Sequence, residues 1–140
     1  MRRRIVAVAV ASGVLLPCAP LVAHHSFSAE FDATKPVTSR GTVTKMAWVN
    51  PHTWIYIDVR TSEGAIAKWE IEGGAPNALF RRGFTKDSLP AGSEIIVGGY
   101  QAKDGANRAN GRDIVFADGR RLFMGSSGNG APGDPDPQGK

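Results

Sequence analysis

Short runs of β-branched and aromatic residues, each closed by turn residues, constrain the fold of this chain most. Segments 41–49 and 53–61 are two such runs, and the turn residues 50–52 separate them. A third run covers 66–72 and follows another turn. Runs of this length with turn signals between them predict a three-stranded antiparallel meander.

The strand pattern breaks at Gly73 and Gly74, where Pro76 and the residues up to Gly83 favour one short helix. Further strands are predicted after this helix, at 94–100, 112–116 and 121–124. Three strands, a helix and then more strands is the order of an OB-fold. The predicted fold class is therefore all-β with one short helix, a small OB-like Greek-key barrel. Another small antiparallel barrel or sandwich is the alternative.

The second predicted strand also indicates which side chains face the core. Period-two alternation places three aliphatic side chains on one face, those of Ile55, Ile57 and Val59. The opposite face then carries Trp54, Tyr56, Asp58 and Arg60. This pattern predicts a strand with one buried face and one exposed face.

The first residues show the three regions of a secretory signal peptide. Residues 2–4 are arginines, residues 5–16 are apolar, and a short segment ends at Ala23. An apolar run of about twelve residues is shorter than the roughly 20 that cross a bilayer as a helix, so no stable membrane anchor is expected after cleavage. We predict a signal peptide over 1–23 and export to the periplasm or the extracellular space. Acylation at Cys18 is the alternative, which Pro17 disfavours.

Cleavage after Ala23 changes the charge and the chemistry of the chain. It removes Cys18, the single cysteine, so the mature chain has neither a disulfide nor a thiol nucleophile. It also removes three arginines and leaves 14 basic residues, of the original 17, against 13 acidic ones. This near-balance argues against a nucleic-acid partner.

Composition divides the mature chain into three parts. Residues 24–39 are mostly polar and include Pro36, which predicts an irregular N-terminal arm. Residues 40–124 carry the strand pattern of the OB-like domain. Residues 125–140 are almost devoid of apolar side chains and cannot offset the entropy of ordering, so a disordered tail is predicted.

Several short motifs of the mature chain resemble one family. They are Ala23-His24-His25-Ser26-Phe27, Gly41-Thr42-Val43, Asn50-Pro51-His52, Glu72-Gly73-Gly74-Ala75-Pro76-Asn77, Arg81-Arg82-Gly83, Gly99-Tyr100, Lys103-Asp104-Gly105 and Asp118-Gly119-Arg120. Together they are similar to a family of small exported bacterial proteins known as a domain of unknown function (6152). The resemblance implies an exported domain and brings no activity with it.

The predicted mature N-terminus starts with two histidines, His24 and His25. A free α-amine and the imidazole of the same residue form a chelate, and a further imidazole completes a nitrogen set that suits Cu(II). His52, the third histidine of the chain, lies in the loop between the first two strands, where OB-folds bind ligands. We therefore expect His24, His25 and His52 to bind copper or a similar divalent metal. In the alternative, His24 and His25 form a frayed terminus and His52 is structural.

The outward pair Trp54 and Tyr56 is the second candidate site, for a protein or glycan partner of the cell envelope. Lys103 and Arg108, in the other ligand loop of an OB-fold, would flank it. The alternative is that the N-terminal arm covers both aromatic rings with Phe27 and Phe31.

Catalysis is not predicted from this sequence, because no motif places an activated nucleophile. Glu70 and Glu72 share one face of the third strand and are expected to be solvated rather than paired for acid–base work. Gly73 and Gly74 lack the remaining residues of a phosphate-binding loop, so they are expected to lead into the helix. The predicted function is that of a binding module without a cofactor other than copper.

Overall fold

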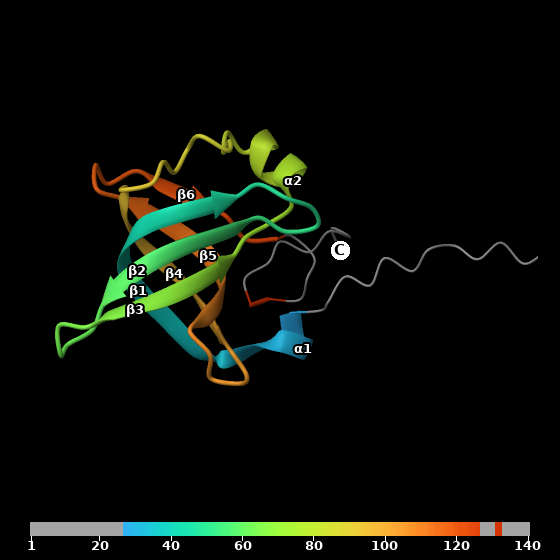
Figure 1. Cartoon of the computed structure of the whole chain (residues 1–140). Helices are drawn as coiled ribbons and strands as arrows, with labels where there is room; N and C mark the ends of the chain where they lie inside the picture. The colour runs from blue at the N-terminus through green and yellow to red at the C-terminus, as the bar shows by residue number, and fades with distance from the viewer. Residues whose placement is uncertain (1–26, 127–130, 133–140) are drawn as a thin grey trace, which may run out of the picture.

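The structure is a computed structural model that describes residues 27–126 and 131–132. Six strands and two short helices follow one another in the order α1 (Phe27–Glu30), β1 (Phe31–Ala47), β2 (Trp54–Arg60), β3 (Ile66–Glu72), α2 (Pro76–Arg81), β4 (Glu94–Ala102), β5 (Arg108–Phe116) and β6 (Arg121–Phe123). In Figure 1, α2 lies above the strands and α1 lies below them. The predicted signal peptide, 1–23, lies outside the described residues.

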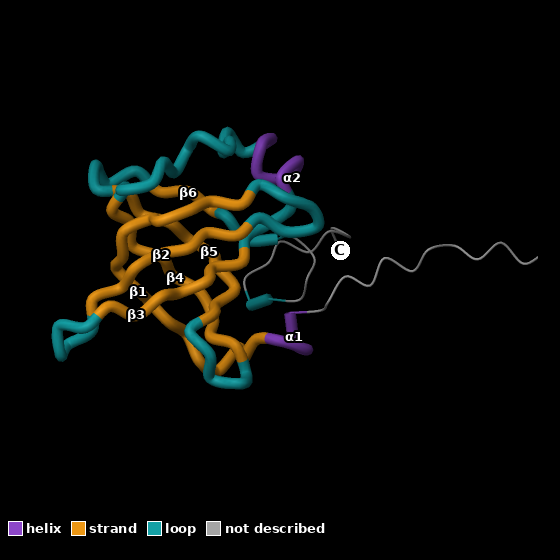
Figure 2. The backbone as a smooth tube through the Cα atoms, viewed as in Figure 1, coloured by secondary structure: helices purple, strands orange, loops and turns teal. Residues whose placement is uncertain are grey.

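The strands form one sheet in the order β3-β2-β1-β4-β5-β6, and all of these neighbours are antiparallel. One further, parallel pairing joins Glu70–Glu72 of β3 to Arg108–Asn110 of β5. The first five strands thus pair in a closed cycle, and Figure 2 shows their strands as the body of the molecule with the loops at its margins. A mostly antiparallel sheet with a short helix between its third and fourth strands confirms the all-β part of the prediction, and a second short helix, α1, precedes β1.

Turn residues end the strands where the sequence indicates. Gly64, between β2 and β3, has a φ of 85°, and Gly105, between β4 and β5, has a φ of 77°. Side chains other than glycine rarely adopt this left-handed region, which explains why glycine stands at both turns. Pro76 occupies the first turn of α2, as predicted.

The core lies on the inner face of the sheet. Ile55 and Ile57 are 0% and 1% exposed, and Val59 packs against the same core, so the predicted direction of β2 is confirmed. The other fully buried members come from all parts of the described domain: Val43, Ile71, Leu79, Phe84, Leu89, Ile95, Val97, Ala109, Ile114 and Met124. Alternation therefore identified the buried face of β2 correctly.

The predicted irregular arm is wrong for the part of it that the structure describes. Residues 27–30 form α1, and residues 31–39 begin β1, which is 17 residues long. The first half of β1 pairs with β4, for example Val37 with Gly99, whereas its pairing with β2 begins only at Thr42. Pro36 lacks an N–H, but it is accommodated next to a register shift of this half-paired strand.

The predicted disordered tail is also corrected at Gly125 and Ala131. Gly125 is buried, and its carbonyl accepts from Arg82 Nη1 at 2.6 Å. Ala131 is 4% exposed and packs in a second apolar cluster with Phe27, Phe31 and Ala102. Tyr100 borders this cluster. The sequence pattern could not reveal the contact, because a single alanine in a Gly- and Pro-rich segment carries no periodic signal.

Candidate functional site

His52 is the one predicted metal ligand within the described residues, since His24 and His25 lie outside them. It follows the cis peptide bond between Asn50 and Pro51 in the loop that joins β1 to β2. Among the described residues, no three His, Cys, Asp or Glu side chains gather in a cluster suited to a metal ion.

The neighbour of His52 ties this loop to the end of β3. The Thr53 N–H donates to the Gly74 carbonyl at 3.1 Å, and the Gly73 N–H donates to the Thr53 carbonyl at 2.8 Å. The buried Thr53 hydroxyl also donates to the Gly74 carbonyl, at 3.0 Å. These bonds hold His52 beside Glu72, the last residue of β3.

Gly73 allows this close approach because it has no side chain. A Cβ atom there would lie 2.6 Å from the Thr53 Oγ1 and 2.7 Å from the Met124 Cε, closer than real contacts allow. The Gly74 N–H donates to the Met124 carbonyl at 2.7 Å. The two glycines therefore lead into α2, as expected, and also join three segments of the chain.

The His52 imidazole pairs with the Glu72 carboxylate, with 2.5 Å between Nδ1 and Oε1. The side chains are 18% and 7% exposed, respectively. The pKa of Glu72 is raised to about 7, mainly by burial and also by the Glu30 carboxylate, while Arg108 acts to lower it. The prediction of a solvated carboxylate face is therefore wrong for Glu72, although Glu70 is exposed as expected.

Asn110 lies beside Glu72 on the adjacent strand β5. Its side chain is 1% exposed, and its Oδ1 atom has no hydrogen-bond partner within the described part of the chain. Asn110 is in turn the register partner of Tyr100 on β4, and the Tyr100 ring contacts Phe27 of α1 edge-on at 5.4 Å between centroids. The buried polar residues thus lie next to the start of α1.

The geometry of the histidine–glutamate pair has a definite chemical consequence. When the Nδ1–H donates to an ionised carboxylate, the imidazole lone pair is on Nε2. This is the arrangement of many metal-binding histidines, in which a carboxylate fixes the tautomer and the ring orientation. An ionised Glu72 would therefore give His52 the tautomer that a metal ligand needs.

The outward pair Trp54 and Tyr56 is half-buried, on the side of β2 that the sequence predicts. The N-terminal arm was expected, as an alternative, to cover these rings with Phe27 and Phe31. Instead, these two phenylalanines stack on each other at 5.9 Å and pack beside Tyr100, so this alternative is wrong.

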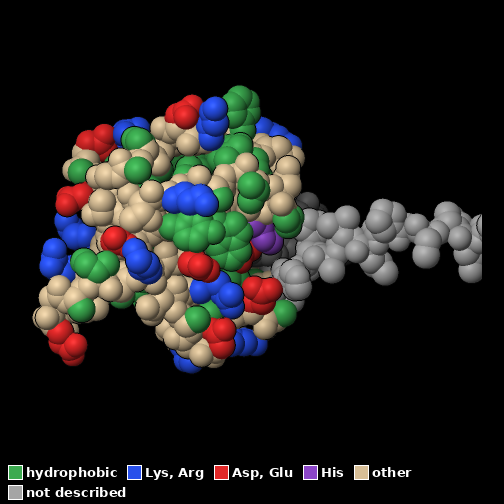
Figure 3. Space-filling view, viewed as in Figure 1, with side chains coloured by type: hydrophobic (Ala, Val, Ile, Leu, Met, Phe, Trp, Pro, Cys, Tyr) green, Lys and Arg blue, Asp and Glu red, His purple; other side chains and the backbone are tan. Residues whose placement is uncertain are grey.

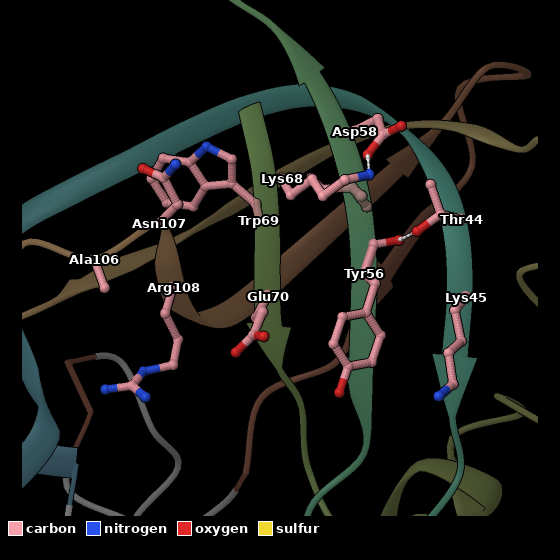
Figure 4. Close-up of a pocket in the computed structure, with 11 residues that line it drawn as sticks. Thr44, Lys45, Tyr56, Asp58, Lys68, Trp69, Glu70, Ala106, Asn107 and Arg108 are labelled. Carbon is pink, nitrogen blue, oxygen red and sulfur yellow. Dashed lines mark hydrogen bonds and ion pairs between the residues drawn. The ribbon is translucent and has the colours of Figure 1, made fainter. Parts of the chain in front are cut away.

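A row of outward side chains crosses four strands beside Tyr56. Register pairs place Lys45 of β1 next to Tyr56, Tyr56 next to Glu70 of β3, and Glu70 next to Arg108 of β5. Figure 4 shows these four side chains extending in the same direction from their strands. They line a cavity of about 500 Å³, together with Thr44, Ile57, Asp58, Lys68, Trp69, Ala106 and Asn107.

The sequence predicts Tyr56, Asp58 and Glu70 on outward faces and Arg108 in a flanking loop, but it does not predict the other lining residues. Lys45 faces outward because the register shifts between Val43 and Lys45, which places an extra residue, Thr44, in the strand. Trp54 is not among the lining residues, and Lys103 instead donates to the Ser28 carbonyl at 2.5 Å. No period-two pattern reveals a bulge of one residue.

Charges of both signs are interspersed on the face seen in Figure 3, around a central group of hydrophobic side chains. Two cationic lining residues pair with carboxylates. The Lys68 Nζ lies 3.1 Å from the Asp58 Oδ1, and the Arg108 Nη2 lies 3.4 Å from the Asp104 Oδ2. A polyanion such as nucleic acid needs a surface dominated by positive charge. The charges on this face are of both signs instead, which does not suit a polyanion.

Comparison with known proteins identifies one family. Its model, described as a family of unknown function (DUF6152), matches residues 13–111 of the chain. No curated protein and no solved structure matches the chain. Among the described residues, neither helix is long and apolar enough to span a membrane.

Proposed function

This chain belongs to the DUF6152 family of unknown function, and from its own side chains we propose that it is an exported, non-enzymatic binding module for a divalent metal. The preferred ion is Cu(II). Its ligands are the amine and imidazole of His24, with His25 and His52. Amine and imidazole nitrogens bind Cu(II) more tightly than the other divalent first-row ions.

The observation that carries this proposal is the contact of His52 Nδ1 with the buried Glu72 carboxylate. Glu72 orients the imidazole and selects the tautomer with its lone pair on Nε2. An oriented imidazole loses less freedom on coordination than a mobile one, and partners of this kind strengthen metal binding.

The place of α1 supports the participation of the two terminal histidines. Phe27 packs against Tyr100, whose register partner Asn110 lies next to Glu72. His25 and His24 precede Phe27 by two and three residues, so their Cα atoms lie at most about 7 and 11 Å from the Phe27 Cα. The proposal requires this reach to bring the two histidines to His52.

The strand pairing supports the OB-like assignment that the proposal includes. Five strands pair in a cycle, β3 and β5 are parallel, and α2 connects β3 to β4. The His52 loop then corresponds to the first of the two ligand loops of an OB-fold. We assign the domain to this class of Greek-key barrels.

The proposed terminal chelate requires that the exported chain begin at His24 after processing. The intact mass of protein recovered from the cell envelope is expected to match a chain that starts at this residue, because the preceding segment has the regions of a signal peptide. Mass spectrometry checks this. Recovery of the full-length chain with Met1, or of a lipid-modified Cys18, would contradict the prediction.

The processed protein is expected to bind one Cu(II) ion per chain in calorimetric titration. His52→Asn should weaken copper binding more than Glu72→Gln does, because it removes an imidazole ligand. The asparagine amide still offers a hydrogen-bond donor to Glu72. Glu72→Gln should weaken binding about 10- to 100-fold, the usual effect of removing a partner that orients a ligand. Affinity should fall as the pH drops through about 6.5, since coordinating imidazoles must be neutral.

One added residue before His24 serves as the control for the terminal chelate, because it displaces the amine and leaves the folded domain unchanged. It is expected to weaken binding, and the melting temperatures of all variants show whether they fold. Equal affinity of the processed protein, the extended protein and His52→Asn would refute the convergent site. A metal-free interaction module that uses Trp54 and Tyr56 would then replace it.

A further inference from the structure

The cavity beside Tyr56 is a second place at which this domain can hold a ligand, and neither His52 nor Glu72 lines it. Its volume of about 500 Å³ lies within the roughly 300–1,000 Å³ of small-molecule sites. It forms where β3 separates from β5, because the parallel pairing begins only at Glu70 and Arg108. Trp69, the residue before Glu70, lines the opening together with Asn107.

The polar groups of this cavity alternate between donors and acceptors. Lys45 and Arg108 supply donors at the two ends of the row, and Glu70 supplies acceptors between them. The Arg108 Nε is buried and has no hydrogen-bond partner within the described part of the chain. A ligand with groups that both donate and accept would satisfy this set.

The charge balance excludes a strongly anionic ligand. Lys68 is paired with Asp58, and Arg108 lies beside Asp104. Lys45 and Glu70, on either side of Tyr56, carry opposite charges. The face therefore offers many charged hydrogen-bonding groups without an excess of either sign.

Two aromatic side chains complete the site. Tyr56 stands in the middle of the row, with the Lys45 ammonium 5.5 Å from its ring centroid. In Figure 4, the Trp69 indole and Asn107 extend away from the row, toward the other end of the cavity. Aromatic rings offer apolar contact area and retain polar edges.

We infer that this cavity binds a carbohydrate. Sugar rings present C–H groups that pack on aromatic side chains, and their hydroxyls both donate to carboxylates and accept from ammonium, guanidinium and amide groups. A neutral oligosaccharide therefore matches the mixed charge, the alternating donors and acceptors, and the two aromatic side chains. The site is independent of the proposed metal site.

The test uses the processed protein and two neutral probes, a β-1,4-linked N-acetylglucosamine hexasaccharide and a β-1,4-linked glucose hexasaccharide. Tryptophan fluorescence reports binding, because Trp69 lines the cavity, and calorimetry measures the affinity. At least one probe is expected to bind. Tyr56→Ala should weaken it about tenfold or more, through loss of the ring contact.

Glu70→Gln separates this proposal from an anionic ligand, and Glu63→Gln, in the exposed β2–β3 turn, is its matched control. Glu70→Gln should weaken a neutral sugar about tenfold, whereas removal of its charge would strengthen binding of an anion. His52→Asn should leave sugar binding unchanged, so failure here and failure of copper binding are distinguishable. Binding of neither hexasaccharide, or stronger binding after Glu70→Gln, would overturn the proposal.

Discussion

Replacement of Ile57 by Asp is expected to unfold the domain. Ile57 is 1% exposed in the core, and its register partners are Val43 on β1 and Trp69 on β3. A carboxylate at this position would be buried without a partner, which costs several kcal/mol. Domains of this size have a total stability of about 5–15 kcal/mol. Circular dichroism during thermal denaturation measures the loss.

Arg60→Ala is the matched control on the same strand. Arg60 is exposed, and its Nη1 donates to the Gly64 carbonyl at 3.2 Å. Its replacement should leave the melting temperature almost unchanged, as surface substitutions usually do. Equal melting temperatures of the Ile57→Asp and Arg60→Ala proteins would show that β2 does not bury the face described above.

The free energy of unfolding is expected to fall as the pH rises from about 4.5 to about 7, measured without metal. Burial raises the pKa of Glu72 from 4.5 to about 7. The folded state therefore keeps a proton in this window that the unfolded state has released. Stability is greatest below the unfolded pKa and is lost as the pH rises through the folded pKa, by up to about 3 kcal/mol.

Glu72→Gln should remove this pH dependence, because glutamine has no ionisable carboxyl group. Glu70→Gln is the control, since Glu70 lies on the same strand and face but is exposed. It should retain the slope. Urea denaturation at a series of pH values provides the measurement, and equal slopes for the wild-type and Glu72→Gln proteins would show that Glu72 does not titrate in this range.

The arm and Lys45 show where local patterns fail. The first half of β1 pairs with β4, so that Val37 meets Gly99 far along the chain. Its strand structure depends on this distant partner, whereas the local sequence contains Pro36 and many polar residues. Lys45 reaches the outer face through a bulge at Thr44, which one strand's alternation does not encode.

Glu72 shows the same limit at the candidate site. Its position in β3 correctly predicts that it shares an outward face with Glu70, yet it is 5% exposed. The His52 loop contacts its carboxylate, and α1 brings Glu30 close enough to raise its pKa. The sequence predicts His52 as a ligand candidate, because it is a histidine in a loop between two strands.

Residue periodicity and turn chemistry along the chain were sufficient for the order of the six strands, for α2 and for the buried face of β2, because these depend on neighbouring residues. They did not reveal the first half of β1 or the start of β5. Folding established the burial of Glu72 against His52, the row from Lys45 to Arg108 and the cavity beside it. Each of these joins residues from separate strands or loops. Desolvation and cavity shape arise only when such segments meet, so no local pattern carries them.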